Sequence, residues 1–379
     1  MKIVFLGCTH NYGYGFSANV TKVGYMAKGL MEAGAECVIH NGIIGNKFVT
    51  KEEKKIVENI PVTSLRKRGS EIFSWLFNVR KVYRYLKAER KGNGKNIAIV
   101  EMDMYHIFLL YYVLCKINKY KLVAISHEWG PTIVEVNVMR KPSNWLYSKT
   151  FGWFVDAILP ISEYIIKKIA HFKKPYFKLP ILSEFNNDDN IIVVERNHLV
   201  YCASVYYKRI IILIIDAYKI YRQNNGKLSL ILVLNGPKEK IEEIAKIISD
   251  NGLKDKIFIK SKLAYNELFE LYMTAASLII PLNPNCEQDE ARFSQKIAEY
   301  LSSKSPIITN NVGEIKYYFS DEDLIKCGYS EESFAEKFKW VEENPRTCQE
   351  IGNNGYNKGK AVFDYNKIGA QMLSFFEEL

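Results

Sequence analysis

The feature that most constrains the fold is an alternation of short apolar runs with segments of helical length. The first series of apolar runs comprises KIVFLG (2–7), ECVIH (36–40), NIAIVEM (96–102), KLVAISH (121–127) and DAILPIS (156–162). A segment of helical length, 18–34, ends at a glycine between the first two of them. This order is typical of parallel strands with helices on both faces of the sheet, so the first series predicts a doubly wound α/β domain.

The same alternation starts again after a polar stretch at 183–198. The second series comprises LVYCASV (199–205), LSLILVLNG (228–236), KIFIKS (256–261), SLIIPL (277–282) and SPIITNN (305–311). A chain of 379 residues is too long for one ordinary core, so we expect two domains. We place them at 1–185 and 190–357, followed by a helix over 358–379 that packs back across the domains. Two α/β domains that face each other would bind a ligand in the cleft at the carboxyl ends of their strands.

The charge of the chain favours an anionic partner. The formal net charge is +10 and the pI is about 9.0, which suits phosphorylated metabolites, a lipid surface or nucleic acid. The seven cysteines are odd in number and never form Cys-x-x-Cys, which indicates reduced thiols in a cytoplasmic protein. The six histidines lack metal-ligand spacing, so we expect no metal site. The N-terminal apolar run is too short for a signal peptide, and the longest apolar run, 105–115, is too short to span a bilayer.

A glycine-rich loop follows the first predicted strand. In GCTHNYGYGFSANV, the residues Gly13, Gly15 and Ala18 satisfy G-x-G-x-x-A, the pattern of dinucleotide-binding loops. Two features argue against a nicotinamide or flavin cofactor: residues 8–12 separate the strand from the motif, and VIHN (38–41) has no acid where the ribose would bind. We therefore expect a loop that contacts substrate through Gly13, Tyr14 and Gly15, with a purely structural turn as the alternative.

A second candidate site lies at the start of the helix predicted over FSQKIAEYLSS (293–303). If this helix begins at Ser294, the first backbone N–H groups are unpaired and form an anion site together with the helix dipole. These groups belong to Gln295, Lys296 and Ile297. Glu299 lies about one turn further along, where its carboxylate would accept hydrogen bonds from the hydroxyl groups of a ribose beside the anion. The alternative is an exposed glutamate on a surface helix.

Two cations follow the strand predicted at 199–205. Lys208 and Arg209 would lie in a loop at the carboxyl end of this strand. Paired cations suit a diphosphate leaving group, because negative charge accumulates on it as it departs. The alternative is a solvated basic pair.

These residues occur in a succession that resembles the C-terminal domain of GT-B glycosyltransferases. It runs over about 199–320, through LVYCASVYYKR, LILVLNGP, SKLAYNELFELYMTAASLIIPLNPN and ARFSQKIAEYLSSKSPIITNNVGEI. It is most similar to glycosyltransferase family 4 (glycosyl transferases group 1), a retaining family that includes sucrose synthases and many bacterial lipopolysaccharide and capsule enzymes. The resemblance extends more weakly to the N-terminal domain, through the glycine loop and DAILPISEYIIKKI (156–169). It implies a GT-B fold, with two Rossmann-like α/β domains facing across a cleft.

The resemblance also implies roles for individual residues. Glu299 matches the second glutamate of the family's E-x7-E motif, which binds the ribose of the donor. Lys208 or Arg209 matches the basic residue that stabilises the departing diphosphate. The helix start that faces the phosphates matches Ser294, Gln295 and Lys296. Residues 261–263 (SKL), which include Lys262 and Leu263, fall where the nucleobase is held.

The sequence departs from the family pattern at two places. The first glutamate of E-x7-E would stand at Ala291, and Glu290 is adjacent but out of register. The carboxylate that binds the hydroxyl groups of the donor sugar is therefore missing or displaced. The glycine that closes the first strand of this domain in the family is Ala203. With these two departures, the sequence does not identify the donor sugar, and an inactive or unusual member of the family stays an alternative.

Candidate residues for the acceptor side follow strands of the first domain. His127 and Glu128 in SHEWGP (126–131) end a predicted strand at the cleft, where a histidine would polarise the attacking hydroxyl group. A satisfied core histidine is the alternative. Asp103 in VEMDMYH is a weaker candidate of the same kind.

The segment 65–91 is strongly basic and predicted to be helical. It carries nine basic residues and only two acidic ones, with apolar residues at helical spacing along one stripe. We consider two arrangements: a helix docked on the core with a charged outer face, and attachment to an anionic membrane surface. No recognisable nucleic-acid-binding module is present, which argues against nucleic acid.

Together these features predict a cytoplasmic glycosyltransferase of polysaccharide biosynthesis, peripheral on the inner face of the cell membrane through 65–91. It would use a nucleotide diphosphate sugar such as a UDP-sugar and a glycan or lipid-linked acceptor. The family resemblance implies retention of the anomeric configuration and no metal or other cofactor. The alternatives are a nucleotide-sugar epimerase of the same fold, a non-catalytic nucleotide-sugar-binding protein and an NAD enzyme.

Overall fold

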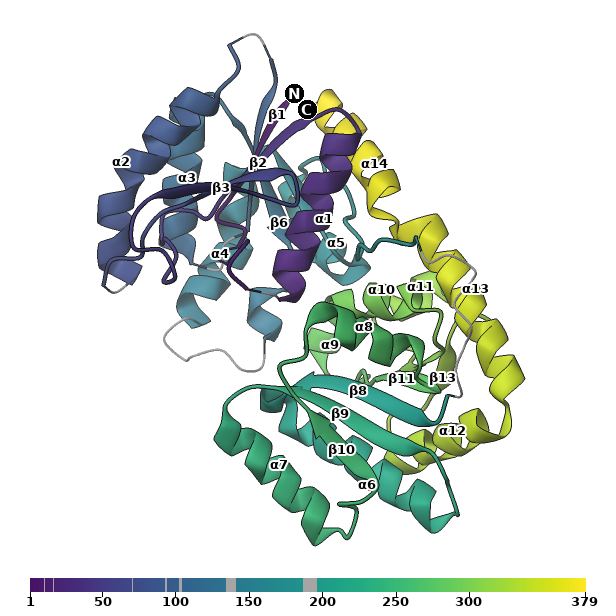
Figure 1. Ribbon diagram of the computed structural model, residues 1–379. Helices are drawn as coiled ribbons and strands as arrows, with labels where there is room; N and C mark the ends of the chain where they lie inside the picture. Colours follow the sequence, from purple (N-terminus) through teal and green to yellow (C-terminus); the bar gives the residue numbers. More distant parts are fainter. Residues whose placement is uncertain are drawn as a thin grey trace. The chain divides into compact units, whose positions relative to one another are not determined.

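The computed structural model describes residues 1–9, 11–15, 17–69, 71–92, 94–101, 104–133, 141–186 and 196–379. The chain divides into two compact units, which are coloured along the sequence in Figure 1. The first unit comprises Met1–Glu184, Ala291–Gln295 and Val362–Leu379, and the second unit comprises Phe185–Glu290 and Lys296–Ala361.

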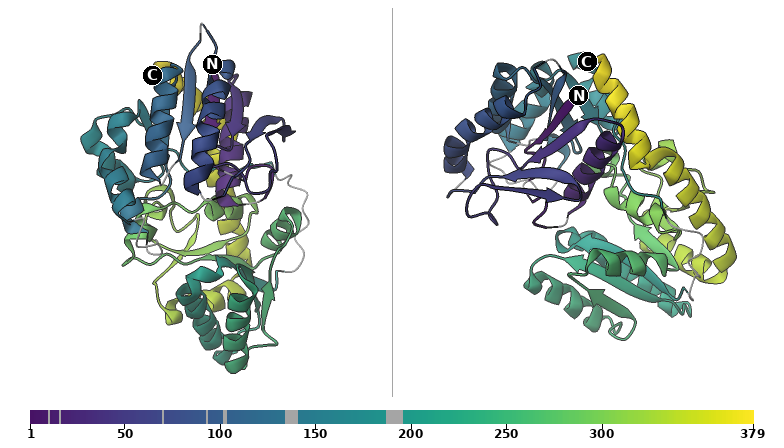
Figure 2. Two further views of the ribbon diagram at one scale, coloured as in Figure 1. Left: turned by 90° about the vertical axis from the view of Figure 1, so that its left-hand side faces the viewer. Right: turned by 45° about the horizontal axis from the view of Figure 1, so that its top comes forward.

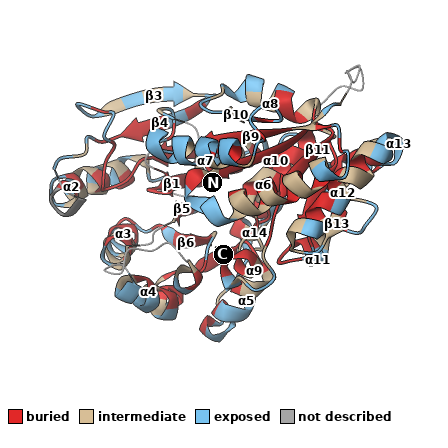
Figure 3. Cartoon of the chain, turned by 90° about the horizontal axis from the view of Figure 1, so that it is seen from below, coloured by how far each residue is buried: buried red, intermediate tan, exposed pale blue. Residues whose placement is uncertain are grey.

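The first unit contains a seven-stranded sheet in the order β3-β4-β2-β1-β5-β6-β7. Its strands are β1 (Lys2–Leu6), β2 (Glu36–His40), β3 (Glu53–Val57), β4 (Ile60–Ser64), β5 (Asn96–Val100), β6 (Lys121–Ser126) and β7 (Ala157–Pro160). All neighbouring strands run parallel except β3, which pairs antiparallel with β4 at the edge of the sheet (Figure 3). Every residue of β1 and β5 is buried, as expected for central strands covered on both faces.

Helices connect these strands. They are α1 (Ala18–Glu32), α2 (Glu71–Glu89), α3 (Tyr105–Ile117), α4 (Lys141–Phe154), α5 (Glu163–Ile169) and α14 (Tyr365–Glu378), with short 3₁₀ turns at Gly130–Thr132 and Ala170–Phe172. Ser17 caps α1, because its hydroxyl group accepts a hydrogen bond from the backbone N–H of Val20 at 3.2 Å.

The second unit contains a six-stranded parallel sheet in the order β10-β9-β8-β11-β12-β13. Its strands are β8 (His198–Ser204), β9 (Ser229–Asn235), β10 (Ile257–Lys260), β11 (Ser277–Ile280), β12 (Ile307–Asn310) and β13 (Ile325–Cys327). Numbered within the unit, this order is 3-2-1-4-5-6, which is that of nucleotide-binding α/β folds. The strand order reverses between β8 and β11.

The helices of the second unit follow the same alternation. They are α6 (Lys208–Gln223), α7 (Lys238–Asp250), α8 (Tyr265–Met273), α9 (Glu287–Ala291), α10 (Gln295–Ser302), α11 (Ile315–Tyr318), α12 (Glu331–Glu343) and α13 (Pro345–Phe363), with a 3₁₀ turn at Val205–Tyr207. The buried face of α6 carries Ile211, Ile214, Ile215 and Tyr218 at helical spacing, which attaches it to the sheet.

The C-terminal helix α14 packs directly on α1 within the first unit (Figure 2). Tyr365 stacks on Tyr25 with ring centroids 5.3 Å apart, and its hydroxyl group donates to the Glu32 carboxylate at 3.0 Å. The two helix backbones meet at Gly29 and Gly369, where neither residue has room for a Cβ atom. The α14–α1 contact therefore holds the helix that begins beside the cavity described below.

The structure differs from the sequence-based expectation at four places. The β3–β4 hairpin and β13 were not expected. The acid-rich segment before α10 was expected to be a loop, but it contains the short helix α9. Lys208 and Arg209 are the first two residues of α6 rather than residues of a preceding loop. No helix in the described part of the chain is long and apolar enough to cross a membrane.

Candidate active site

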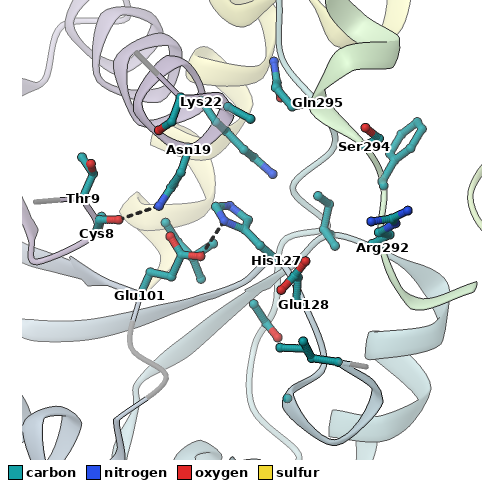
Figure 4. A pocket seen from close by; sticks show the side chains of 18 of the residues that line it. Cys8, Thr9, Asn19, Lys22, Glu101, His127, Glu128, Arg292, Ser294 and Gln295 are labelled. Atoms are coloured by element: carbon teal, nitrogen blue, oxygen red, sulfur yellow. Dashed lines mark hydrogen bonds and ion pairs between the residues drawn. The ribbon is translucent and has the colours of Figure 1, made fainter. Parts of the chain in front are cut away.

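A cavity of about 960 Å³ lies in the first unit at the carboxyl ends of its parallel strands (Figure 4). Its wall includes residues that follow β1, β5, β6 and β7, and also the start of α1. The strand order of this unit reverses between β1 and β5, because β1 leads through α1 to β2 on one side and β5 leads through α3 to β6 on the other. Ligands of open α/β sheets bind at such a reversal, so the cavity is a candidate binding site.

Glu101 and His127 form a hydrogen-bonded pair in this cavity. Nδ1 of His127 lies 2.8 Å from Oε1 of Glu101, and the two side chains are only 13% and 26% exposed. A carboxylate partner holds the imidazole proton on Nδ1, so this N–H donates to Glu101 and Nε2 keeps a lone pair. Among the described residues, nothing forms a hydrogen bond with Nε2. The pair can therefore accept a proton or a hydrogen bond from a ligand at Nε2.

Burial sets the protonation of this pair. Burial lowers the pKa of His127, and the charge of Glu101 offsets part of that effect, so the imidazole is neutral near neutral pH. Burial alone would raise the pKa of Glu101, but the charge that His127 carries when protonated and the hydrogen bond between the two lower it below its usual value, with a contribution from Lys22. A neutral histidine beside an ionised glutamate is the arrangement of a general base or of a hydrogen-bond acceptor.

Lys22 extends from α1 toward the same space (Figure 4). It is 3% exposed, and its ammonium group has no hydrogen-bond partner in the described part of the chain. Burial lowers the pKa of Lys22 to about 7, although the charge of Glu101 acts in the opposite direction. Asn19, one turn earlier, donates from Nδ2 to the carbonyl oxygen of Cys8 at 2.8 Å and so ties the start of α1 to the end of β1. Burial raises the pKa of the Cys8 thiol, which argues against a nucleophilic role.

The segment from Ala291 to Gln295 contributes to the cavity from a distant part of the sequence. It is held in the first unit by two contacts: Ser162 Oγ donates to the carbonyl oxygen of Ala291 at 2.5 Å, and the Gln295 side chain binds the backbone of Leu182. Arg292 and Ser294 line the cavity as a result.

Two of the residues expected on the acceptor side lie together here, and the three glycine-loop residues expected to contact substrate lie elsewhere. His127 and Glu128 line the cavity, and Glu128 is exposed. Gly13, Tyr14 and Gly15 are not among its lining residues. Lys55 instead holds this loop against β3, because its ammonium group donates to Gly13 O at 2.7 Å and lies 3.4 Å from the Tyr14 ring centroid. Asp103 lies outside the described residues.

Two of the residues expected to bind a diphosphate, Lys208 and Arg209, lie at the reversal point of the second sheet, whereas Ser294 and Gln295 belong to the first unit and line its cavity. Lys208 and Arg209 begin α6 directly after β8, and both are exposed. Lys208 pairs with Glu243 at 3.0 Å. Arg209 lies near Tyr329, whose pKa is raised by burial and by the charge of Asp289 and lowered by Arg209. Because cations at a helix N-terminus oppose the helix dipole, this arrangement favours a bound anion.

The helix α10 starts directly after Ser294, as the sequence suggested. Lys296 donates from its ammonium group to the carbonyl oxygen of Cys202 at 2.6 Å, which joins α10 to the end of β8. Glu299 is 5% exposed, so the alternative of an exposed surface glutamate does not hold. Burial raises the pKa of Glu299 to about 7, and the charge of Lys296 lowers it.

Three further residues were expected to bind the donor: Glu290, Lys262 and Leu263. The sequence did not indicate the contacts that Glu290 makes or the backbone conformation of Lys262. Glu290 accepts a hydrogen bond from the backbone N–H of Gly313 at 3.1 Å and pairs with Lys316 at 2.7 Å, so it binds the loop after β12. Lys262 and Leu263 follow β10 at its carboxyl end, and Lys262 adopts a positive φ of 55°.

Sequence reasoning missed three charged residues of the cavity: Lys22, Glu101 and Arg292. Glu101 directly follows a buried strand, which is the same signal that pointed to His127. Lys22 carried a different signal, because it precedes Met26 and Leu30 at a spacing of four residues and so stands in the apolar stripe of α1. Arg292 had no such signal, since its place in the first unit depends on the tertiary structure.

Solved structures share this architecture over the whole chain. Sucrose-phosphate synthase from Thermosynechococcus elongatus superposes with a TM-score of 0.74 at 12% identity, covering 100% of this chain and 98% of that one. HepE of Anabaena in complex with UDP-glucose has a TM-score of 0.73 at 13% identity, with 100% of both chains covered. A glycosyltransferase from Rickettsia africae has a TM-score of 0.70 at 13% identity, covering 100% of this chain and 97% of that one. Compared with curated protein sequences, the chain has no significant match.

The chain therefore has the GT-B fold of these glycosyltransferases, and the fold class predicted from the sequence is confirmed. Residues 183–358 match the family described as Glycosyl transferases group 1, which confirms the resemblance noted in the sequence. The matched range covers most of the second unit, including Lys208, Arg209 and Glu299.

Proposed function

We propose that the chain is a glycosyltransferase that moves a sugar from a nucleotide diphosphate sugar to a hydroxyl group of a glycan or lipid-linked glycan. The observation that carries this proposal is the Glu101–His127 pair, which presents to a cavity in a GT-B chain an Nε2 atom that no described residue binds. The family match of residues 183–358 supports a nucleotide-sugar donor, and the HepE complex with UDP-glucose supports a UDP-sugar in particular.

The acceptor would bind in the cavity of the first unit. Nε2 of His127 would accept a hydrogen bond from the attacking hydroxyl group and so orient its lone pair, while Glu101 holds the imidazole in the required tautomer. Glu128, which lines the same wall, would contact another acceptor hydroxyl group.

The donor would bind at the reversal point of the second sheet. Lys208, Arg209 and the start of α10 would meet the charge of the departing diphosphate without a metal ion. Glu299 would bind the ribose hydroxyl groups, and the loop with Lys262 and Leu263 would hold the nucleobase. Retention of the anomeric configuration follows from the family resemblance and is part of the proposal.

The proposal is tested with radiolabelled nucleotide sugars and a membrane extract as the source of acceptor. A thermal-shift screen first selects the donor, since the correct nucleotide sugar stabilises the folded chain. We expect label to move to a lipid or polymer, with the anomeric configuration of the product read by NMR. Release of a free, altered sugar would favour the epimerase, and donor binding without turnover would favour a binding protein.

Replacing Glu299 by glutamine should weaken the binding of UDP-glucose about tenfold at pH 8, because a charged hydrogen-bond acceptor is lost. In the wild type, affinity should rise from about pH 6 to about pH 8, since Glu299 ionises with a pKa of about 7. The variant should lack this pH dependence. UDP-glucose is a suitable probe because its diphosphate does not titrate in this range, and isothermal titration calorimetry measures both effects.

The matched control is Glu336→Gln, which changes an exposed glutamate of α12 in the same unit. It should leave both the affinity and its pH dependence unchanged. Wild-type affinity in Glu299→Gln would remove this residue from the donor site.

We also propose that α2 attaches the chain to an anionic membrane surface. Its outer face exposes Phe77 at 56%, followed by the exposed basic residues Arg80, Arg84 and Lys87, and the Arg68 guanidinium lies 5.2 Å from the Phe77 ring centroid. Each basic residue near such a surface contributes about 1 kcal/mol.

Reversing the charges of Arg80, Arg84 and Lys87 to glutamate should lower binding to phosphatidylglycerol vesicles by at least about tenfold. Co-sedimentation with vesicles measures the change, and vesicles of phosphatidylcholine alone should bind neither protein. The control reverses three exposed lysines of α7: Lys238, Lys240 and Lys246. Equal loss of binding in the control would indicate a general charge effect and contradict a role for α2.

A further inference from the structure

Lys22 is a buried cation whose ammonium group forms no hydrogen bond within the part of the chain that the structure describes. The side chain is 3% exposed. An unpaired ammonium group in such a place costs folding free energy. The ammonium end points into the cavity rather than into the core of the unit (Figure 4). A ligand in the cavity could therefore supply the missing anion.

Glu101 does not fill this role. Its Oε1 atom is engaged by His127 Nδ1 at 2.8 Å, and its Oε2 atom forms no hydrogen bond with Lys22 or with any other described residue, so Lys22 interacts with Glu101 only through space. A carboxylate shared in this way leaves the ammonium group able to bind a second anion.

The start of α1 provides a second, independent feature on the same wall. Ser17, Ala18 and Asn19 line the cavity, so the N-terminus of this 15-residue helix faces it. The first turn contains no acidic residue that would neutralise the helix dipole. Helix N-termini of this kind bind carboxylate and phosphate groups. Arg292 adds a further cation to the lining.

We propose that the acceptor carries a negatively charged group, a carboxylate or a phosphate, which binds between Lys22 and the N-terminus of α1. This inference rests on the proposed function, because it takes the cavity that contains His127 as the acceptor site. The volume of about 960 Å³ is sufficient for an acidic sugar with its attacking hydroxyl group at Nε2 of His127. The donor is the other source of phosphate, and the experiment separates the two.

The test compares the wild type with Lys22→Met, which keeps the length of the side chain and removes the charge. The ligands are glucuronate, inorganic phosphate, glucose and UDP, and binding is measured by titration followed by NMR. We expect the wild type to prefer glucuronate over glucose by at least about tenfold, and Lys22→Met to lose this preference. UDP affinity should not change.

The matched control is Lys28→Met on the same helix, which removes a cation that pairs with Glu58 outside the cavity. It should keep the preference for glucuronate. The proposal is overturned if neither anion binds in a Lys22-dependent way, or if glucose binds as well as glucuronate. A loss of UDP affinity alone in Lys22→Met would assign Lys22 to the donor phosphates and would also overturn it.

Two further readouts do not depend on catalysis. At about pH 6, where Lys22 is charged, Lys22→Met should raise the Tm of the ligand-free protein, since a buried charge is removed that has no hydrogen-bond partner among the described residues. A lower Tm would mean that the fold satisfies Lys22, which contradicts the proposal. Binding of glucuronate near pH 8 should take up protons, because the anion favours charged Lys22 over its neutral form. Among the described lining residues, the other charged or titratable groups are Cys8, Glu101, His127, Glu128, Tyr147 and Arg292. Calorimetry in buffers of different ionisation enthalpy measures this uptake, which Lys22→Met should abolish.

If UDP-sugars neither bind nor react but glucuronate still binds through Lys22, the proposed glycosyl transfer fails while the anion site remains. If transfer occurs but Lys22→Met changes nothing, the anion site fails while the proposed function remains.

Discussion

Replacing His127 by glutamine lowers the rate of sugar transfer by about 10²- to 10⁴-fold, the range expected when a group that accepts the proton or hydrogen bond of a nucleophile is removed. Glutamine preserves much of the volume of the imidazole, and its amide is a far weaker base. UDP-sugar affinity should remain that of the wild type, because the residues expected to bind the diphosphate and the ribose, Lys208, Arg209 and Glu299, lie in the second unit. Steady-state kinetics with the acceptor identified in the transfer assay, together with donor titrations, measure the two effects.

The pH profile distinguishes this role from a structural one. Because burial lowers the pKa of His127, the acid limb of kcat/KM should lie below the usual titration range of histidine, with activity lost as the imidazole protonates. Glu101→Gln removes the charge that raises the pKa of His127, so the acid limb should move to still lower pH. It should also lower the rate, because the carboxylate no longer holds the tautomer. A His127→Gln variant with wild-type kcat/KM would exclude the histidine from the reaction.

Replacing Gly369 by leucine should destabilise the chain by about 3 kcal/mol or more, beyond the usual cost of overpacking. A Cβ atom at Gly369 would lie 2.1 Å from the carbonyl carbon of Gly29, and one at Gly29 would lie 2.2 Å from the carbonyl oxygen of Tyr365. Both obstacles are backbone atoms, so no side chain can rotate away to relieve them. The helices α1 and α14 would have to separate, and their shared core with Met372 and Phe376 would be lost. Thermal and denaturant unfolding measure the loss.

Gly92→Leu is the control for this substitution, because a Cβ atom at Gly92 meets no atom of the described residues within 4 Å. It should change stability little. Hydrogen exchange should show faster exchange in α1 and α14 of the Gly369→Leu variant, and binding in the cavity should weaken because α1 carries Lys22 and Asn19. Wild-type stability in Gly369→Leu would contradict the close contact between the two helices.

The central strands could be predicted because buried strands appear in the sequence as continuous apolar runs. The strands and helices at the edges could not be predicted in this way. The strand β3, EKKIV, has charged residues at half-exposed positions, and β4, IPVTS, contains a proline, so neither resembles a buried strand. The helix α9 is short and acidic and lacks an apolar stripe long enough to recognise. These elements form because a neighbouring strand or turn is already in place.

In the candidate site too, some residues could be predicted from the sequence, and others depend on the tertiary structure. His127 could be found because a polar residue directly after a buried parallel strand lies at the binding edge of the sheet. Its partner Glu101 could be found by the same rule, but their hydrogen bond depends on β5 and β6 being neighbours with matching register. Gly13 and Tyr14 are bound by Lys55 of β3 and are not among the residues that line the cavity, so their contact with substrate stays a prediction.

The sequence by itself determined the two parallel sheets, the start of α10 and the kind of residue at the strand ends, because apolar periodicity and helix capping are local properties. Only the tertiary structure decided which of those residues share a cavity. The burial of Lys22 beside Glu101, and the placement of Arg292 in the first unit, arise from packing between segments far apart in the chain. The pKa and the hydrogen bonds of a charged group depend on the residues that surround it. The tertiary structure therefore determines the chemical properties of Lys22, Glu101 and Arg292 in this cavity.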